Sequence, residues 1–520
     1  MKSLNLHIID YILIGISLII SILIGLRFSK KQDNVKKYFT ASGSIPSWAI
    51  GMSILATLIS SITFLAYPGE GYKSNWILLV QGLMVPITLI FFIGFIVPLY
   101  RKFIKLSAYE YFEQRFGFLA RLYSSLAFFL AHFSKMGTVF FLIALAFSKM
   151  TGFNTMELIW IIGIIVIFIT LIGGIEAVIW LDVFQGLLLI LGGIATILII
   201  IYSTQGGLSA IWSVARENGR IGFGPYDFDF VRLTFIVMIL NGIFYAIQKY
   251  GTDQTIVQRY LTARSDREAI KASLMGVLMS VPVWALFMFI GTALFGYYQI
   301  SGDPLPANIK PDAVFPIFII SKLPVGMIGL VLSALLAAAI SSLDSDLNCL
   351  SAICVEDYYV RFKPDSTEKQ RMLVGRLIVV FAGLAAIFVA MYYINKGGKG
   401  VLGIVFMLYS IFSAGIAGMF LLGIFTKKAN KQGVYIGITA SVIFTAYAVL
   451  TSSSINIGGK NQLIMDLGKY NFNHHKYMLG VYSHIVLFVV GYFASFFFKS
   501  NKNINALTYS GWLQNKKLNN

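Results

Sequence analysis

Two aspartates and three serines close a long apolar run near residue 340. The run from Val325 to Ile340 carries no charged side chain, and Ser333 is its only polar one. It leads into Ala-Ala-Ala-Ile-Ser-Ser-Leu-Asp-Ser-Asp-Leu-Asn at 337–348. Carboxylates and hydroxyls are costly in or near lipid unless they face water, pair with each other or bind an ion. Because their oxygens are hard donors that suit Na⁺ better than soft metals, the pattern predicts a cation site inside a membrane protein.

The serines of this stretch share one face of the predicted helix. At spacings of three and four, the residues on that stripe are Ala338, Ser341, Ser342 and Ser345. Serines in membrane helices also donate hydrogen bonds to carbonyls one turn earlier, which is the alternative interpretation. The adjacent Asp344 and Asp346 favour the ion site, because a carboxylate at membrane depth needs a compensating charge.

A third aspartate, Asp182, stands where a predicted loop enters an apolar segment. It ends the stretch Gly-Gly-Ile-Glu-Ala-Val-Ile-Trp-Leu-Asp at 173–182. Its alternative role is that of a carboxylate near a helix N-terminus, where the helix dipole favours negative charge.

The composition is that of a helical protein with many membrane spans. Of the 520 residues, 57% are hydrophobic and only 12% are charged, against about 25% charged in soluble domains. Stretches of about 18 or more apolar residues predict an all-α polytopic membrane protein with thirteen spans. They lie near 8–27, 45–67, 76–100, 122–148, 157–172, 178–203, 232–257, 271–297, 313–356, 374–394, 400–425, 432–453 and 477–498.

Basic residues gather in alternate predicted loops, which sets the predicted orientation. One of these loops holds Arg259, Arg264, Arg267 and Lys271. The positive-inside rule places these loops in the cytoplasm, with the N-terminus outside and the C-terminus inside the cell. The net charge of +18 is therefore attributed to topology, and no nucleic-acid partner is expected. Cys349 and Cys354 lie on different faces of one predicted helix and cannot pair. No Walker motif and no nucleophile–base or metal-ligand constellation occurs, so neither an ATP-driven pump nor an enzyme is expected.

Two predicted spans are interrupted by polar residues. Ser60, Ser61 and Thr63 interrupt the second span, and a polar, glycine-containing stretch at 248–254 interrupts the seventh. Broken helices in corresponding positions of two halves point to a transporter binding site. The predicted organisation is an extra helix at 1–40, a ten-helix core at 41–453 with repeats 41–205 and 230–453, and a final segment at 454–520. That segment comprises an external loop, the last span and a cytoplasmic tail.

Several separate stretches resemble the sodium/solute symporter family, which includes sodium/glucose, sodium/sialic acid and sodium/multivitamin transporters. The resembling motifs are Gly-Gly-x-x-Ala-Val-x-Trp-x-Asp-x-x-Gln at 173–185, Asp-Gln-x-x-Val-Gln-Arg-Tyr at 253–260, the stretch 338–348 and the stretch 54–64. The resemblance covers about residues 8 to 450. It implies LeuT-like inverted five-helix repeats and transport by alternating access.

The resemblance implies sodium ligands on the second and ninth spans. Those of the common Na⁺ site fall on the carbonyls of Ala56, Ile59 and Ala338 and the hydroxyls of Ser341 and Ser342. Sialic acid transporters look to have a second Na⁺ site, whose counterparts are Asp182, Ser341, Asp344 and Ser345. Asp344 stands where those members carry a hydroxyl residue, and the Na⁺ stoichiometry stays open.

Solute contacts of the family map to the broken helices and their neighbours. They fall on Leu58, Ser60, Thr63, Gln81, Lys135, Phe244, Lys249 and Tyr250. Lys135 replaces the arginine that meets the substrate carboxylate in the sialic acid transporters. A lysine paired with an acid, or one reaching a polar surface, is the alternative. Lys is a point charge without the bidentate fork of Arg, so a carboxylate substrate is predicted more firmly than sialic acid itself.

Together the sequence predicts a Na⁺-coupled symporter of the inner (plasma) membrane that imports a small organic solute. The expected solute is a carboxylate-bearing sugar such as sialic acid, or another organic anion. The expected partners are this solute and the lipid bilayer, and a monomer suffices for transport. Leu58 and Thr63 replace an Asn and a Gln of the sugar-transporting members, which argues against a neutral sugar. A Na⁺/neutral sugar symporter remains the alternative, followed by an ion channel or sensor on the same scaffold.

Overall fold

The computed structural model describes residues 6–29, 34–306, 309–395, 411, 413–457, 460–499 and 506–519. Within these ranges the protein is helical, with one short β-hairpin of strands β1 (Ser454–Ile457) and β2 (Lys460–Leu463). Nine helices are long and apolar enough to cross a membrane, counted over the described residues. The chain is therefore a multi-pass membrane protein.

The helices of the first half carry the second predicted span and its neighbours. They are α1 (Ile8–Ser29), α2 (Val35–Thr40), α3 (Ser47–Leu58), α4 (Ser61–Lys73), α5 (Leu79–Phe103), α6 (Glu110–Phe116), α7 (Phe118–Thr151), α8 (Thr155–Ser203) and α9 (Gly207–Glu217).

The helices of the second half carry the seventh predicted span and the long apolar run near residue 340. They are α10 (Phe235–Gly251), α11 (Gln254–Thr262), α12 (Asp266–Ser301), α13 (Pro311–Lys322), α14 (Met327–Ile353), α15 (Val360–Phe362), α16 (Glu368–Asn395), α18 (Ile416–Phe425), α19 (Lys431–Ser452), α20 (Lys476–Ala494) and α21 (Tyr509–Asn519). A π-helical turn at Cys354–Tyr359 joins α14 to α15.

Both predicted helix breaks are confirmed. In the second span α3 ends at Leu58 and α4 begins at Ser61, and the two halves of this span are bent by 58°. In the seventh span α10 ends at Gly251 and α11 begins at Gln254. The predicted end of the second span at 67 is wrong, because α4 continues through Pro68 to Lys73.

Other predicted boundaries changed in ways that matter for the site. The region 313–356, which the sequence analysis gives as one span, is a short helix, α13, followed by the long α14. The predicted loop before Asp182 is wrong: only Gly174, with φ 59° and ψ −165°, is non-helical within α8. Thirteen spans would require α8 to cross twice and α10 and α18 to cross as well, so that number stays a prediction. Residues 400–410 of the eleventh predicted span lie outside the described residues.

Helix α14 lies at the centre of the packed helices. In the most apolar stretch of the segment Met327–Phe362, which contains α14, 83% is buried inside the protein. The corresponding share for α1 is 28%. Helix α14 therefore contacts mainly protein, whereas α1 leaves most of its surface to lipid. It packs along α8, where a Cβ built on Gly192 would lie 2.8 Å from the Cβ of Ala334. Small residues let the two backbones approach this closely. The polar residues at the end of α14 are therefore held away from lipid.

A buried carboxylate on α1 anchors the first turn of α14. Asp10 is fully buried, and its Oδ1 accepts hydrogen bonds from the backbone N–H groups of Gly326 (2.8 Å) and Gly329 (2.7 Å). Because the first N–H groups of a helix lack intrahelical partners, Asp10 acts as a helix cap supplied by another helix.

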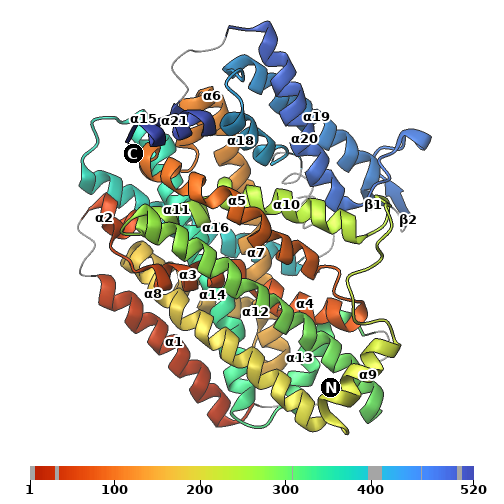
Figure 1. Ribbon diagram of the computed structural model, residues 1–520. Helices are drawn as coiled ribbons and strands as arrows, with labels where there is room; N and C mark the ends of the chain where they lie inside the picture. Colours follow the sequence, from red (N-terminus) through yellow and green to blue (C-terminus); the bar gives the residue numbers. More distant parts are fainter. Residues whose placement is uncertain are drawn as a thin grey trace.

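The arrangement of the helices can be followed in Figure 1. Figure 1 shows α2, α6 and α15 toward the upper left, and α9 and the β-hairpin toward the right. Helix α1 packs along α8, and α19 packs against α20 near the β-hairpin. The broken helices α3–α4 and α10–α11 lie between these two groups (Figure 1).

Candidate ion and solute site

The carboxylate of Asp182 is the meeting point of three helices. It lies on α8 and is fully buried. Its Oδ1 accepts a hydrogen bond from the Ser341 hydroxyl of α14 at 2.5 Å. Its Oδ2 accepts from the Ser53 hydroxyl of α3 at 2.5 Å. The alternative role, a carboxylate near a helix N-terminus, does not describe Asp182: the residue lies deep inside α8 (Thr155–Ser203), about two turns beyond the non-helical Gly174, and the dipole of a helix end acts only within the first turn.

Arg259 on α11 neutralises Asp182. Its Nη2 lies 2.8 Å from Asp182 Oδ2 and also donates to Ser345 Oγ at 2.8 Å. Its Nε donates to Ser53 Oγ at 2.7 Å, and its Nη1 donates to the carbonyl of Thr255 at 2.5 Å. Both members of the ion pair are fully buried.

The assignment of Arg259 to a basic loop is therefore wrong. The sequence grouped it with exposed basic residues because it follows the apolar segment, whereas α11 turns its Gln258 and Arg259 into the protein. The signal that could have found it is Asp182 itself, since a carboxylate inside an apolar segment requires a cation.

The predicted common Na⁺ ligands lie at the break of the second span and on the facing turn of α14. Ser53 and Ser341 hold the same carboxylate, which brings α3 against α14. All five predicted ligands are buried: Ala56, Ile59, Ala338, Ser341 and Ser342.

Several oxygens of these predicted ligands have lone pairs that can coordinate a cation. Ser342 Oγ is fully buried and has no hydrogen-bond partner among the described residues. The described backbone also donates no hydrogen bond to the carbonyls of Ala56 and Ile59, because α3 ends there. The Ser341 hydroxyl donates a hydrogen bond to Asp182, and the lone pairs of its oxygen stay available to a cation. The donor set of carbonyls and hydroxyls fits a hard monovalent cation.

The predicted second Na⁺ site includes one carboxylate with no side-chain partner. Asp344 is fully buried, and neither of its oxygens accepts a hydrogen bond from a described side chain. It lies close enough to Asp182 and Arg259 to interact electrostatically with both. Asp182, Ser341 and Ser345 are brought together as predicted, with the guanidinium of Arg259 among them.

A second buried charge cluster surrounds His132 and Lys135 of α7. Lys135 Nζ donates to Asp346 of α14 at 3.1 Å, and His132 Nδ1 lies 2.8 Å from the same carboxylate. His132 Nε2 lies 3.6 Å from Oδ2 of Asp253, which also accepts from Lys249 Nζ at 2.7 Å. The alternative interpretation of Lys135, a lysine paired with an acid, thus describes its contact in this structure.

The remaining predicted solute residues lie at the helix breaks and on α5 and α10. Leu58, Ser60 and Thr63 are buried around the α3–α4 break. Gln81 of α5 donates from Nε2 to Asn241 Oδ1 of α10 at 2.9 Å.

Two predicted solute residues on α10, Phe244 and Lys249, have side-chain partners, and the hydroxyl of a third, Tyr250, has no hydrogen-bond partner among the described residues. Phe244 packs on His484 with ring centroids 5.4 Å apart. Tyr250 is fully buried, and Lys249 faces the first turn of α11 through Asp253 and Thr255 (3.1 Å). Lys249 and Tyr250 therefore contact protein rather than an open space.

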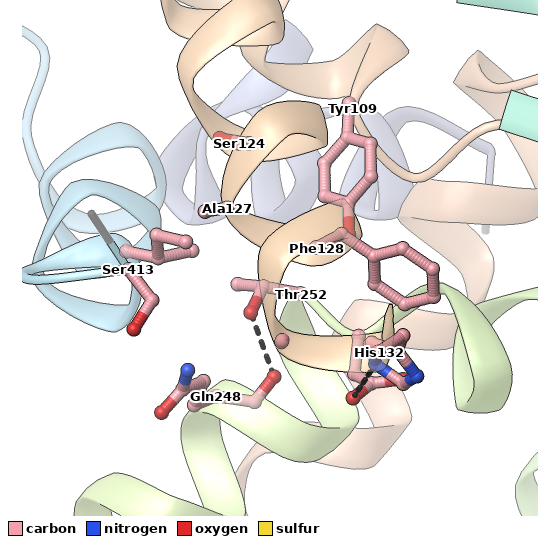
Figure 2. Close-up of a pocket in the computed structure, with 11 residues that line it drawn as sticks. Tyr109, Ser124, Ala127, Phe128, His132, Gln248, Thr252 and Ser413 are labelled. Carbon is pink, nitrogen blue, oxygen red and sulfur yellow. Dashed lines mark hydrogen bonds and ion pairs between the residues drawn. The ribbon is translucent and has the colours of Figure 1, made fainter. Parts of the chain in front are cut away.

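A small cavity of about 40 Å³ adjoins the His132 cluster (Figure 2). Figure 2 shows the His132 imidazole against the ring of Phe128, with Gln248 and Thr252 of the broken seventh span nearby. Its lining also includes Tyr109, Ser124, Asp253, Ser413 and Ile416. A cavity of this volume has room for about one water molecule. None of the predicted solute residues lines it.

Two broken helices, buried oxygens with free capacity and compensated charges at membrane depth define a class of protein. Such arrangements belong to secondary transporters, which bind ion and solute where helices are interrupted. The comparisons with known proteins extend this conclusion.

Residues 38–440 match the sequence profile of the sodium:solute symporter family. The chain is 34% identical over 456 residues to the sodium/sialic acid symporter of Proteus mirabilis, covering 84% of this chain and 91% of the relative. It is 30% identical over 481 residues to the sodium/sialic acid symporter of Aliivibrio fischeri, covering 92% and 91%. It is 31% identical over 475 residues to the sodium/glucose cotransporter of Vibrio parahaemolyticus, covering 85% of each.

A solved structure agrees with these relatives. It shows a Na⁺-coupled sialic acid symporter in a substrate-bound outward-open state, with a TM-score of 0.86 and 30% identity, covering 95% of this chain and 99% of that one. The protein belongs to the sodium:solute symporter family. It is thus a Na⁺-coupled membrane transporter of small solutes with a LeuT-like fold, and not an enzyme.

Proposed function

We propose that this transporter imports a carboxylate-bearing sugar such as sialic acid together with Na⁺. Two observations support the proposal. Its relatives in Proteus mirabilis and Aliivibrio fischeri are sodium/sialic acid symporters. The observation that carries the coupling to Na⁺ is the buried hydroxyl of Ser342, which has no hydrogen-bond partner within the described part of the chain and lies beside the interrupted helix of the second span.

Na⁺ binds first in the proposed cycle. The carbonyls of Ala56, Ile59 and Ala338 and the hydroxyls of Ser341 and Ser342 surround it. Because its ligands come from both α3 and α14, bound Na⁺ stabilises the arrangement in which these helices lie against each other. A second Na⁺ binds at Asp182, Ser341, Asp344 and Ser345.

The solute binds beside the broken helices in the next step. Leu58, Ser60, Thr63, Gln81 and Phe244 line its site, and Lys135 attracts its carboxylate, while Lys249 and Tyr250 support the lining from behind. Rocking of one group of helices against the other then exposes both cargoes to the other side.

The proposed setting is the inner membrane of the cell. The N-terminus lies outside and the C-terminus inside, with the basic loops in the cytoplasm. Residues 41–453 form the transport core with repeats 41–205 and 230–453, and a monomer completes one cycle. The segment 1–40 adds the extra helix, and 454–520 adds the loop, the last span and the tail.

Uptake by the Ser342→Ala variant tests the sodium site. We expect the Na⁺ concentration for half-maximal uptake of radiolabelled N-acetylneuraminate by proteoliposomes to rise about tenfold, because one of five oxygen ligands is lost; this equals about 1.4 kcal/mol. The matched control is Ser333→Ala on the same helix, whose hydroxyl donates to the carbonyl of Gly329 at 2.8 Å. An unchanged Na⁺ dependence in Ser342→Ala would refute the assignment.

A neutral sugar is the second candidate solute, and one contact favours it. Lys135 is already neutralised by Asp346, so its charge is not free to demand an anion. The relative from Vibrio parahaemolyticus is a sodium/glucose cotransporter. Competition against N-acetylneuraminate uptake separates the two candidates. Pyruvate, glucose and galactose serve as competitors, and inhibition by only the neutral sugars would overturn the carboxylate proposal.

A further inference from the structure

The imidazole of His132 stands between two buried carboxylates. Its Nδ1 lies 2.8 Å from Asp346 Oδ1, and its Nε2 lies 3.6 Å from Asp253 Oδ2. A neutral imidazole carries one N–H and can donate to only one carboxylate, whereas the protonated ring donates to both. The site is therefore arranged to accept a proton on either nitrogen.

The charges around His132 balance only while the ring is neutral. Asp346 and Asp253 contribute two negative charges, and Lys135 and Lys249 contribute two positive charges. Three further described groups face this cluster and are neutral in their ordinary state: Tyr109 from the segment before α6, Tyr260 from α11 and Cys349 from the next turn of α14. Asp344 also interacts electrostatically with Asp346, and its charge is counted with the Asp182–Arg259 pair. With neutral His132 the sum is zero, and any added charge lacks a counter-ion.

An anionic solute would disturb this balance. Lys135 is the most accessible of the five groups, with 25% of its side chain exposed against 1% for Asp346. A solute carboxylate that reaches Lys135 must share it with Asp346, which leaves one excess negative charge in a buried cluster. Such an uncompensated charge is costly, so binding favours whatever cation restores neutrality.

The Na⁺ proposed at the second site balances a different charge, that of the cluster around Asp182. When Asp344 is ionised, it and Asp182 carry two negative charges beside the one positive charge of Arg259. Na⁺ bound there compensates the remaining negative charge. The predicted ligands of the other Na⁺ are carbonyls and hydroxyls of α3 and α14 and do not include Asp346, so the group placed to neutralise the excess charge at Asp346 is His132, whose Nδ1 lies 2.8 Å away.

We propose that His132 takes up one proton from water when an anionic solute binds at Lys135. This inference rests on the proposed function and adds a proton to its cargo. The cavity of about 40 Å³ beside His132 and Asp253 has room for a water molecule, through which a proton can reach the ring (Figure 2). The imidazolium then donates to both Asp346 and Asp253, and Lys135 is released toward the solute.

Proton uptake during binding is the direct test. The full-length protein in detergent, with saturating Na⁺ and almost no buffer, receives N-acetylneuraminate while a pH indicator reports the proton balance. We expect uptake approaching one proton per bound solute at about pH 8, where histidine is ordinarily neutral. By linkage, the dissociation constant should rise about tenfold for each pH unit in this range. The methyl ester of N-acetylneuraminate, which carries no charge, should bind without proton uptake.

Two variants assign the proton to a residue. His132→Gln should still bind N-acetylneuraminate, more weakly, with no proton uptake and no pH dependence. His474→Gln is the control, because His474 lies in the segment before α20 and contacts Tyr482 (2.6 Å), Phe230 and Phe472 instead of the buried charge cluster; its proton uptake should match that of the unmodified protein. Asp346→Asn should also bind without uptake, since removing the competing carboxylate leaves Lys135 free.

The outcomes separate this inference from the proposed function. Na⁺-dependent binding without proton uptake in the unmodified protein would overturn the inference and leave the proposed function standing. Undiminished proton uptake on solute binding in the His132→Gln variant would overturn the role of His132. Absence of Na⁺-dependent binding for every carboxylate tried would overturn both proposals.

Discussion

Replacing Arg259 with methionine removes the buried cation of Asp182 and keeps a side chain of similar length. Asp182 would retain its two serine donors and lose its only charged partner at 2.8 Å. Breaking a fully buried ion pair at one partner typically costs about 3–5 kcal/mol, because it leaves an uncompensated charge. Ser53 and Ser345 also lose their guanidinium donor. We therefore expect a loss of stability at the upper end of that range when Na⁺ is absent.

Sodium should recover much of this loss, because Asp182 and Asp344 would then share a pocket with no protein cation. Stabilisation by a ligand at 100 times its dissociation constant is about 2.7 kcal/mol. The assay is thermal unfolding of the purified protein at increasing NaCl, with choline chloride holding the ionic strength constant. Na⁺ should raise the unfolding temperature of Arg259→Met by more than that of the unmodified protein.

Arg264→Met is the matched control for this experiment. Arg264 is exposed and donates from Nε only to the carbonyl of Ser44 at 3.0 Å. Its loss should change stability little, because surface groups contribute little. A stability of Arg259→Met equal to that of Arg264→Met, or the same response to Na⁺ and choline, would refute the role given to Arg259.

Two further predictions concern helix anchoring and acid stability. Asp10→Ala should destabilise the protein by about 1–3 kcal/mol, because two N–H groups at the start of α14 lose their acceptor; thermal unfolding equal to that of the unmodified protein would contradict this. Burial tends to raise the pKa of Glu113, but hydrogen bonds from Arg121 and Arg361 outweigh it and hold this pKa below its ordinary value of 4.5. Since the folded-state pKa is lowered, the stabilisation by Glu113 is present above pH 4.5 and is lost as the pH falls through the lowered value. Glu113→Gln should flatten that part of the acid-unfolding curve, and an unchanged curve would show that the two arginines do not act through this carboxylate.

The sequence was sufficient to predict the interrupted helices. Polar residues inside apolar segments have few explanations at membrane depth, so Ser60 and the polar stretch at 248–254 located both breaks. Family resemblance selected the stripe of α14 that faces α3 and α8. Both results depend on local patterns, which a sequence displays directly.

Pairings between distant segments could not be predicted. Arg259 lies 77 positions from Asp182, and Lys135 lies 211 positions from Asp346. A basic residue after an apolar segment has the same local signature whether it faces water or turns inward, so Arg259 was placed in a loop. The one-residue interruption at Gly174 was likewise hidden, because a glycine pair predicts a loop as readily as a kink within one helix.

The two aspartates at the end of α14 occupy different electrostatic surroundings although one residue separates them. Positions two apart in a helix differ by about 200°, so Asp344 and Asp346 project toward different neighbours. Asp346 meets Lys135 and His132, whereas Asp344 lies near the Asp182–Arg259 pair and has no side-chain donor among the described residues. With His132 neutral, the first face of α14 is thus neutral in the absence of ions, and the second carries one excess negative charge when Asp344 is ionised. We infer that the second face binds the cation and the first responds to the charge of the solute. Asp344→Ser should accordingly reduce the Na⁺ dependence of binding and leave proton uptake by His132 intact, and loss of proton uptake in that variant would show that the two faces act as one site.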